Sequence, residues 1–173
     1  MKIVSKLAGA AFLTLFLALC SGGAFAQSND DLLPVGSKAP DFRLKQNGGG
    51  TVRLSTLLKS NKVVLLNFWM IYCPPCRAEL PELSKMRTRL RGKGFDILSV
   101  NVMDSPADAA KFWKYNRLTM RLGLDGGQTA SEKYRVTAVP ANYLIGRNGR
   151  ILARYVGYDA NGIRQTLAKS GIR

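Results

Sequence analysis

Residues 62–76 read KVVLLNFWMIYCPPC, an apolar, β-rich run that leads into two cysteines separated by two prolines. A single polar residue, Asn67, interrupts the run, and this pattern is typical of a central strand covered on both faces. Apolar side chains then recur at helical spacing until Gly92: Leu80, Leu83, Met86 and Leu90. The stretch therefore predicts a buried strand, a cysteine pair at its end and a helix that begins at the pair.

Strands and helices alternate along the rest of the chain. A β-hairpin is expected around the glycines at 48–50, and another with its turn at 147–150. Further strands are expected at 95–102, 121–125, 141–145 and 150–156, and helices at 55–59, 106–116, 128–134 and from 160 onward. Ser55, Ser105 and Asp159 are the expected helix caps. This order predicts one α/β domain over residues 35–173, a three-layer α/β/α sandwich with a central mixed sheet.

Composition limits the chemistry that the chain can perform. Its 173 residues include no histidine, which excludes Ser-His-Asp and Cys-His catalysis and every His-ligated metal or haem site. Lys and Arg outnumber Asp and Glu by 26 to 11, a net charge of +15. This charge favours an acidic client or an anionic membrane surface, and plain solvation of the basic side chains stays open. No basic–aromatic array is evident, so nucleic acid is not an expected partner.

Residues 1–26 have the composition of a signal peptide and are set apart from the fold. Two lysines precede the apolar run of residues 7–19, and residues 24–26, Ala-Phe-Ala, suit signal peptidase. An uncleaved membrane anchor is the main alternative, and a lipid-modified Cys20 is a third. Each alternative places the domain outside the cytoplasm, where disulfides persist. Residues 27–34 are expected to form a polar lead-in.

Several chemistries use a Cys-x-x-Cys pair such as Cys73 and Cys76. A structural zinc site here lacks two ligands, covalent haem attachment lacks a histidine after the pair, and an iron–sulfur cluster needs more thiolates. A permanent structural disulfide stays open, although so short a loop removes little entropy from the unfolded chain. A redox-active dithiol is the favoured interpretation.

The position of the pair at the start of a helix predicts different roles for the two cysteines. Unpaired backbone N–H groups and the helix dipole stabilise a thiolate there, which lowers a cysteine pKa. Cys73 is therefore expected to be the exposed nucleophile, and Cys76 the shielded cysteine that resolves the mixed disulfide. Pro74 and Pro75 fix the turn between them.

Four other side chains are candidates for the site. Trp69 and Tyr72 are expected to wall it, the alternative being that both are core aromatics. Glu79 shares a helical face with Cys76, so a buried carboxyl there could carry the proton of that thiol. The alternative for Glu79 is a solvated acid in the first turn of the helix. Pro140 directly precedes a strand and is a candidate for a cis peptide bond.

Three stretches carry a family resemblance: VGSKAPDF at 35–42, LNFWMIYCPPCRAELPEL at 66–83 and VTAVPANYLIGRNGRI at 136–151. They resemble the thioredoxin superfamily, and more closely its extracytoplasmic TlpA/ResA-like thiol–disulfide oxidoreductases. The resemblance covers about residues 34–170. It implies a thioredoxin-like fold with an N-terminal β-hairpin and a β-α insertion near residues 101–125.

The same resemblance implies roles for individual residues. It makes Cys73, Cys76 and Glu79 the catalytic residues, and Pro140 the cis-proline that offers its backbone to the substrate. It also matches Trp69, before the cysteine pair, and Val139, before the proline. The predicted substrate-binding residues are Trp69, Tyr72, Pro74, Pro75, Val139 and Pro140.

The chain also departs from its relatives. Asn67 stands where cytoplasmic thioredoxins have a buried Asp, which leaves Glu79 as the better proton carrier. Ala141 and Asn142 replace the usual Thr-rich pair, and the cytochrome-maturation subgroup often has Glu at the position of Ala141. Peroxiredoxins share VGSKAPDF but have Thr where Met70 stands, and copper-delivery relatives use a histidine.

The leading hypothesis is a periplasmic enzyme that reduces disulfides in extracytoplasmic client proteins, with cytochrome c maturation as a candidate role. A membrane donor of the DsbD/CcdA type would supply electrons. No metal and no cofactor besides the redox-active disulfide is expected, and a monomer is expected. Two alternatives stay open: a disulfide-forming oxidant or isomerase, and a holdase or assembly factor in which the cysteines are secondary.

Overall fold

The computed structural model describes residues 31–173. In chain order the elements are β1 (Arg43–Gln46), β2 (Thr51–Arg53), α1 (Leu54–Ser60), β3 (Val63–Trp69), α2 (Pro74–Leu90), the 3-10 helix η2 (Arg91–Lys93), β4 (Phe95–Asn101), α3 (Pro106–Tyr115), β5 (Arg121–Leu124), α4 (Thr129–Lys133), β6 (Ala141–Gly146), β7 (Ile151–Val156) and α5 (Ala160–Lys169). Each predicted strand and helix is present, with ends that differ by a few residues.

The strands form one seven-stranded sheet in the order β2-β1-β5-β4-β3-β6-β7. β3, β4 and β5 are parallel, whereas β6 and β7 add antiparallel strands at one edge and the β1-β2 hairpin lies at the other. α3 and β5 lie within residues 101–125, the range in which the β-α insertion was expected. The predicted three-layer α/β/α fold of the thioredoxin type, with a mixed central sheet, is confirmed.

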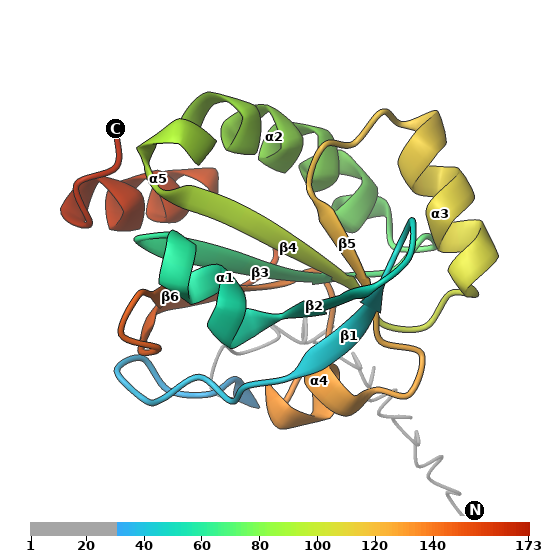
Figure 1. Cartoon of the computed structure of the whole chain (residues 1–173), viewed down its shortest axis with the longest axis horizontal. Helices are drawn as coiled ribbons and strands as arrows, with labels where there is room; N and C mark the ends of the chain where they lie inside the picture. Colours follow the sequence, from blue (N-terminus) through green and yellow to red (C-terminus); the bar gives the residue numbers. More distant parts are fainter. Residues whose placement is uncertain (1–30) are drawn as a thin grey trace, which may run out of the picture.

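Helices cover both faces of the sheet (Figure 1). α2, α3 and α5 pack on one face, and α1 and α4 pack on the other. β3 serves both layers because successive side chains of a strand point to opposite faces. Val64 and Leu66 join the cluster under α1 and α4, while Val63 and Leu65 join the cluster under α2. This double burial explains why residues 63–69 are apolar at every position except Asn67.

One row of polar residues crosses the middle of the apolar sheet. Asn67 on β3 lies opposite Ser99 on β4 and opposite Asn142 on β6. All three residues are fully buried. Asn67 shares its face with Leu65, so the row lies beneath α2, the helix that begins at the cysteine pair.

Two of the three predicted caps are confirmed. The side chains of Ser105 and Asp159 each accept a backbone N–H in the first turns of α3 and α5. Ser55 was expected to cap α1, but this prediction is wrong because the helix begins at Leu54. The N–H and hydroxyl of Ser55 instead donate to the carboxylate of Asp41, at 3.0 and 2.9 Å. The carboxylate of Asp41, 14 residues earlier in the chain, therefore accepts the backbone N–H that a local N-cap side chain would accept.

The expected signal peptide, residues 1–26, and Cys20 lie outside the described residues. Part of the expected lead-in is described, and it belongs to the domain. Leu32 is buried in the core, and the N–H of Leu33 donates to the hydroxyl of Tyr143 at 3.0 Å. The packed unit therefore begins before residue 35.

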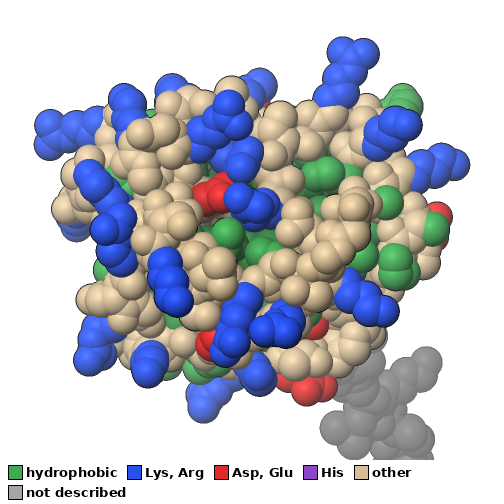
Figure 2. Space-filling view, viewed as in Figure 1, with side chains coloured by type: hydrophobic (Ala, Val, Ile, Leu, Met, Phe, Trp, Pro, Cys, Tyr) green, Lys and Arg blue, Asp and Glu red, His purple; other side chains and the backbone are tan. Residues whose placement is uncertain are grey.

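Basic side chains cover the surface without forming one patch on the face that Figure 2 shows. Lys and Arg are spread over that whole face and few acids stand among them. This distribution fits a solvated basic surface and supplies long-range attraction for acidic partners.

A charged cluster ties α2 to the sheet. The carboxylate of Asp96 on β4 accepts from Arg87 on α2 at 2.5 Å and from Arg121 on β5 at 2.9 Å. Burial disfavours the charged form of Asp96, but the hydrogen bonds from Arg87 and Arg121 hold its pKa below the ordinary value. The cluster therefore stabilises the docking of α2, whose first turn holds the cysteines.

Replacement of Asp96 by Asn is expected to lower the free energy of unfolding at pH 7 by about 3 kcal/mol, because it leaves Arg87 without its counter-charge. The difference from the wild type should shrink as the pH falls toward 3, where Asp96 itself becomes protonated. Urea unfolding at both pH values measures this. Glu82→Gln, which breaks an exposed pair with Lys85, is the control and should have a much smaller effect. Equal losses in the two variants would contradict the assignment.

Candidate active site

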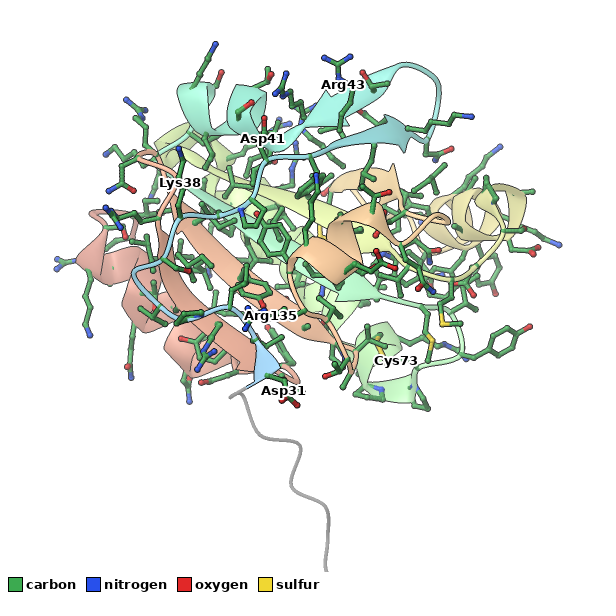
Figure 3. All side chains as sticks on the ribbon, turned by 90° about the horizontal axis from the view of Figure 1, so that it is seen from below. Asp31, Lys38, Asp41, Arg43, Cys73 and Arg135 are labelled. Atoms are coloured by element: carbon green, nitrogen blue, oxygen red, sulfur yellow. A yellow bond between two sulfur atoms is a disulfide. The ribbon has the colours of Figure 1, made fainter. Side chains whose placement is uncertain are left out.

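The cysteine pair joins β3 to α2. Cys73 is the N-cap of α2, and Pro74 and Pro75 occupy the first two helical positions, where a missing N–H costs nothing. Cys73 and Cys76 form a disulfide with an S–S distance of 2.08 Å. The backbone N–H of Cys76 points at the Cys73 sulfur, with an N–S distance of 3.2 Å. Figure 3 shows Cys73 at the edge of the molecule, beside the sulfur–sulfur bond.

The two cysteines differ little in exposure in the disulfide form. Cys73 was expected to be exposed, but it is only 4% exposed, and Cys76 is fully buried. The neighbouring Pro74 and Pro75 are the exposed residues of the motif. This burial depends on tertiary packing, which no local pattern shows, because Cys73 belongs to a core cluster against which Val139 also packs.

The Val139–Pro140 peptide bond is cis, as predicted. The carbonyl oxygen of Val139 lies 3.6 Å from the Cys73 sulfur, so this loop faces the disulfide. The carbonyl of Pro140 accepts the N–H of Gly157 at 2.7 Å and is therefore occupied. The backbone group that faces the cysteines is the carbonyl of Val139, which is also one of the predicted substrate-binding residues.

Trp69 and Tyr72 do not form a common wall. Trp69 is fully buried in the cluster that contains both cysteines, and its ring packs on Phe112 and Trp113 with centroid distances of 5.3 and 5.4 Å. It is thus a core aromatic that supports the pair from beneath, and its indole N–H has no hydrogen-bond partner among the described residues. Tyr72 is 87% exposed and borders a separate cleft together with α3.

Glu79 is fully buried under the helix that carries the cysteines. Its Oε1 accepts from the side-chain amide of Asn67 at 2.5 Å, and its Oε2 accepts from that of Asn142 at 3.2 Å. The two amides also bond to each other at 3.1 Å, and Ser99 donates to the oxygen of Asn67 at 3.2 Å. The alternative of a solvated acid at this position is wrong.

Burial raises the pKa of Glu79 to about 7, because desolvation disfavours the carboxylate, while hydrogen bonds from Asn142 and Asn67 act in the opposite direction. A carboxyl that titrates near neutral pH can both accept and release a proton under ordinary conditions. This property, one helical turn from Cys76, makes Glu79 a candidate proton carrier for the second thiol.

Asn142 and Ser99 were not among the predicted site residues, although Asn142 was noted as a departure from the usual pair after the proline. Their place in the network follows from strand register, which brings together residues 32 and 75 positions away from Asn67. A usable sequence signal is a polar side chain flanked by apolar residues inside each of three buried strands.

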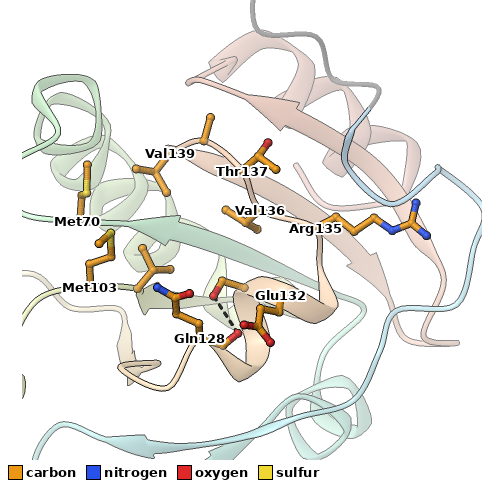
Figure 4. Close-up of a pocket in the computed structure, with 11 residues that line it drawn as sticks. Met70, Met103, Gln128, Glu132, Arg135, Val136, Thr137 and Val139 are labelled. Atoms are coloured by element: carbon orange, nitrogen blue, oxygen red, sulfur yellow. Dashed lines mark hydrogen bonds between the residues drawn. The ribbon is translucent and has the colours of Figure 1, made fainter.

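A cavity of about 580 Å³ opens beside the disulfide loop. Its apolar lining includes Met70, Met103 and Val139, which Figure 4 shows on one side, while Arg135 points away from them. Val139 belongs both to this cavity and to the surroundings of Cys73. A chain that approaches Cys73 along this loop therefore meets an apolar surface.

Within residues 31–173 no helix is both long and apolar enough to span a bilayer. The same part of the chain holds no cluster of three Cys, Asp or Glu side chains suited to a metal ion.

The α/β/α fold and a disulfide at the start of α2, facing a cis-proline loop, define a thiol–disulfide oxidoreductase of the thioredoxin superfamily. Residues 35–154 match the AhpC/TSA family, and the chain belongs to it.

Individual relatives agree with this class. The thiol-disulfide oxidoreductase ResA of Bacillus subtilis is 31% identical over 122 residues, which are 70% of this chain and 67% of the relative. The thiol:disulfide interchange protein HelX of Rhodobacter capsulatus is 33% identical over 138 residues, 78% of this chain and 76% of the relative. The solution structure of a thiol:disulfide interchange protein from Bacteroides sp. superimposes with a TM-score of 0.70 at 27% identity, covering 79% of this chain and 90% of that one.

The titration of Glu79 has a measurable consequence for stability. Since its pKa is raised from 4.5 to about 7 on folding, the native state keeps a proton that the unfolded state loses between these values. The free energy of unfolding should therefore fall by about 3 kcal/mol relative to Glu79→Gln as the pH rises from 4.5 to 8. Urea unfolding of both proteins in their disulfide forms measures the difference. Parallel pH curves would show that Glu79 does not titrate in this range.

Proposed function

We propose that the protein reduces disulfide bonds in client proteins outside the cytoplasm, by exchange with the dithiol of Cys73 and Cys76. The observation that carries this proposal is the placement of the Cys73 sulfur, between the N–H of Cys76 and the carbonyl of Val139 at the start of α2. A thiolate at this position gains a hydrogen bond and the favourable end of the helix dipole.

The reaction has two steps. The Cys73 thiolate attacks one sulfur of the client disulfide, and the other client sulfur leaves as a thiolate. Cys76 then gives its proton to the Glu79 carboxylate and attacks the Cys73 sulfur, which releases the second client thiolate. The client gains two electrons and takes up two protons, one of them from Glu79, and the protein is left in the disulfide form.

Client binding is assigned to the surface next to Cys73. Pro74 and Pro75 are exposed there, and the Val139 loop connects the disulfide to the apolar cavity with Met70. Trp69 supports this surface from the core and is not itself in reach of a client. The redox-active disulfide is the only cofactor in this mechanism.

Location and electron supply follow from the same proposal. The composition of residues 1–26 supports export, and a membrane donor of the DsbD/CcdA type would return the disulfide to the dithiol. The similarity to the thiol-disulfide oxidoreductase ResA and the thiol:disulfide interchange protein HelX supports the exchange chemistry. Apocytochrome c is one candidate client, and Ala141 in the position of the usual Glu separates this chain from that subgroup.

Replacement of Cys76 by Ser should leave the mixed disulfide on Cys73 unresolved. When the reduced variant is mixed with a peptide disulfide, mass spectrometry is expected to find a covalent adduct on Cys73 that dithiothreitol removes. Cys73→Ser is the matched control and should form no adduct. Full disulfide turnover by Cys73→Ser would contradict the proposal and favour the holdase alternative.

The reduction potential distinguishes a reductant from a disulfide-forming oxidant. We expect a value near that of thioredoxin, about −270 mV, because the rigid double proline and the reductive relatives both favour a stable disulfide. Equilibration with glutathione buffers, read by alkylation and mass spectrometry, measures it. A value above about −180 mV would support the oxidant or isomerase alternative instead.

A further inference from the structure

Asn142 occupies a junction between the buried carboxyl and the cis-proline loop. It lies on β6, two residues after Pro140, and is fully buried. Its amide nitrogen donates to Glu79 Oε2 and to the carbonyl of Gly157, both at 3.2 Å. Its amide oxygen accepts from Asn67 at 3.1 Å. Every polar atom of the Asn142 side chain thus has a partner.

The donors around Glu79 match its ionised form. The two amide hydrogens of Asn67 go to Glu79 Oε1 and to the Asn142 oxygen, and those of Asn142 go to Glu79 Oε2 and to Gly157. Both carboxyl oxygens therefore accept, which suits a carboxylate. A protonated Glu79 would present an O–H to an N–H at one of these contacts, so protonation breaks a hydrogen bond.

Asn142 also fixes the loop that faces Cys73. Gly157 accepts from Asn142 through its carbonyl and donates its own N–H to the carbonyl of Pro140 at 2.7 Å. The residue before Pro140, Val139, lies next to the Cys73 sulfur. One amide therefore holds both the carboxyl near the second thiol and the backbone near the first.

We propose that Asn142 is a positioning residue for the second step of exchange, an inference that rests on the proposed function. Asn142 holds Glu79 as the proton-accepting carboxylate and anchors the Pro140 loop. The amides act where no counter-charge is available, since no ion pair to Glu79 is found within residues 31–173. Hydrogen bonds to the charged form of a buried carboxyl favour that form.

The other titratable groups near Glu79 belong to the elements packed around it. On α2 these are Cys76 and Glu82, the latter paired with exposed Lys85. Tyr158 follows β7. Burial is the main cause that raises its pKa, the negative charges of Glu82 and Glu79 raise it further, and the positive charge of Arg164 on α5 lowers it. On the strand side the facing groups are neutral: Ser99, Asn67 and Asn142.

The test compares Asn142→Leu with the wild type. Leucine fills a similar volume without a donor, so the pKa of Glu79 in the disulfide form should rise by about one unit or more, as measured by carbon NMR titration of the labelled carboxyl. Starting from a pKa of about 7, a shift of one unit lowers the ionised fraction at pH 7 about five-fold. The rate of mixed-disulfide resolution should fall by the same factor at pH 7 and recover near pH 9.

Asn101→Leu is the matched control. Asn101 is also a buried asparagine whose amide donates to a carboxylate, that of Asp104 at 2.6 Å, at the end of β4. This substitution should leave the titration of Glu79 unchanged. If Asn142→Leu does not fold, Asn142→Ala removes the same donor with less apolar volume and serves in its place.

The possible outcomes are distinct. The proposal is supported if Asn142→Leu raises the pKa of Glu79 and shifts the pH profile of mixed-disulfide resolution. That shift should be absent when Glu79→Gln is added. An unchanged pKa in a folded variant overturns the proposal, and so does a raised pKa with an unmoved rate profile. Failure of the proposed disulfide-reducing function would be detected by a different measurement, namely disulfide turnover that persists in Cys73→Ser.

Discussion

The buried carboxyl of Glu79, held by two amides, is the constraint around which the site is arranged. Glu79 has no counter-charge in the described part of the chain, and its oxygens accept from Asn67 and Asn142. The cost of removing a carboxylate from water is large, and hydrogen bonds offset only part of it. The result is a group that titrates near pH 7 instead of one that is permanently charged or neutral.

This arrangement requires a particular strand register and a particular position of α2 on the sheet. The two amides come from β3 and β6, which pair antiparallel, and only the observed register sets Asn67 opposite Asn142. A shift by one residue would turn one amide to the opposite face and replace it with an apolar side chain. α2 must also lie over this row, and the cluster of Asp96 with Arg87 and Arg121 ties it there. The cysteine chemistry at the start of α2 thus depends on contacts in the middle of the sheet.

Much of the fold was predictable from local patterns. The apolar run before the cysteines, the helical spacing after them and the hairpin turns each depend on residues close in sequence. Cys73, Cys76 and cis-Pro140 were predictable as well, partly through family resemblance. The burial of Glu79 was one of two open alternatives, because helical spacing fixes a face but does not show whether that face is covered.

What escaped prediction depends on long-range packing. The partnership of Asn142 with Glu79 joins residues 63 positions apart, and the cap that Asp41 provides to α1 spans 14. The low exposure of Cys73 and the outward position of Tyr72 likewise depend on how loops fold over the site. No short-range pattern encodes these contacts.

Glu79 is proposed to accept the proton of Cys76 in the second step of exchange. The most direct test of this role is the rate of mixed-disulfide resolution as a function of pH, followed in a stopped-flow instrument with a peptide disulfide. We expect the rate to rise through an apparent pKa near 7 in the wild type. In Glu79→Gln this rise should be lost, while the first attack by Cys73 is largely preserved. Identical pH profiles for the resolution step in the two proteins would contradict this role of Glu79.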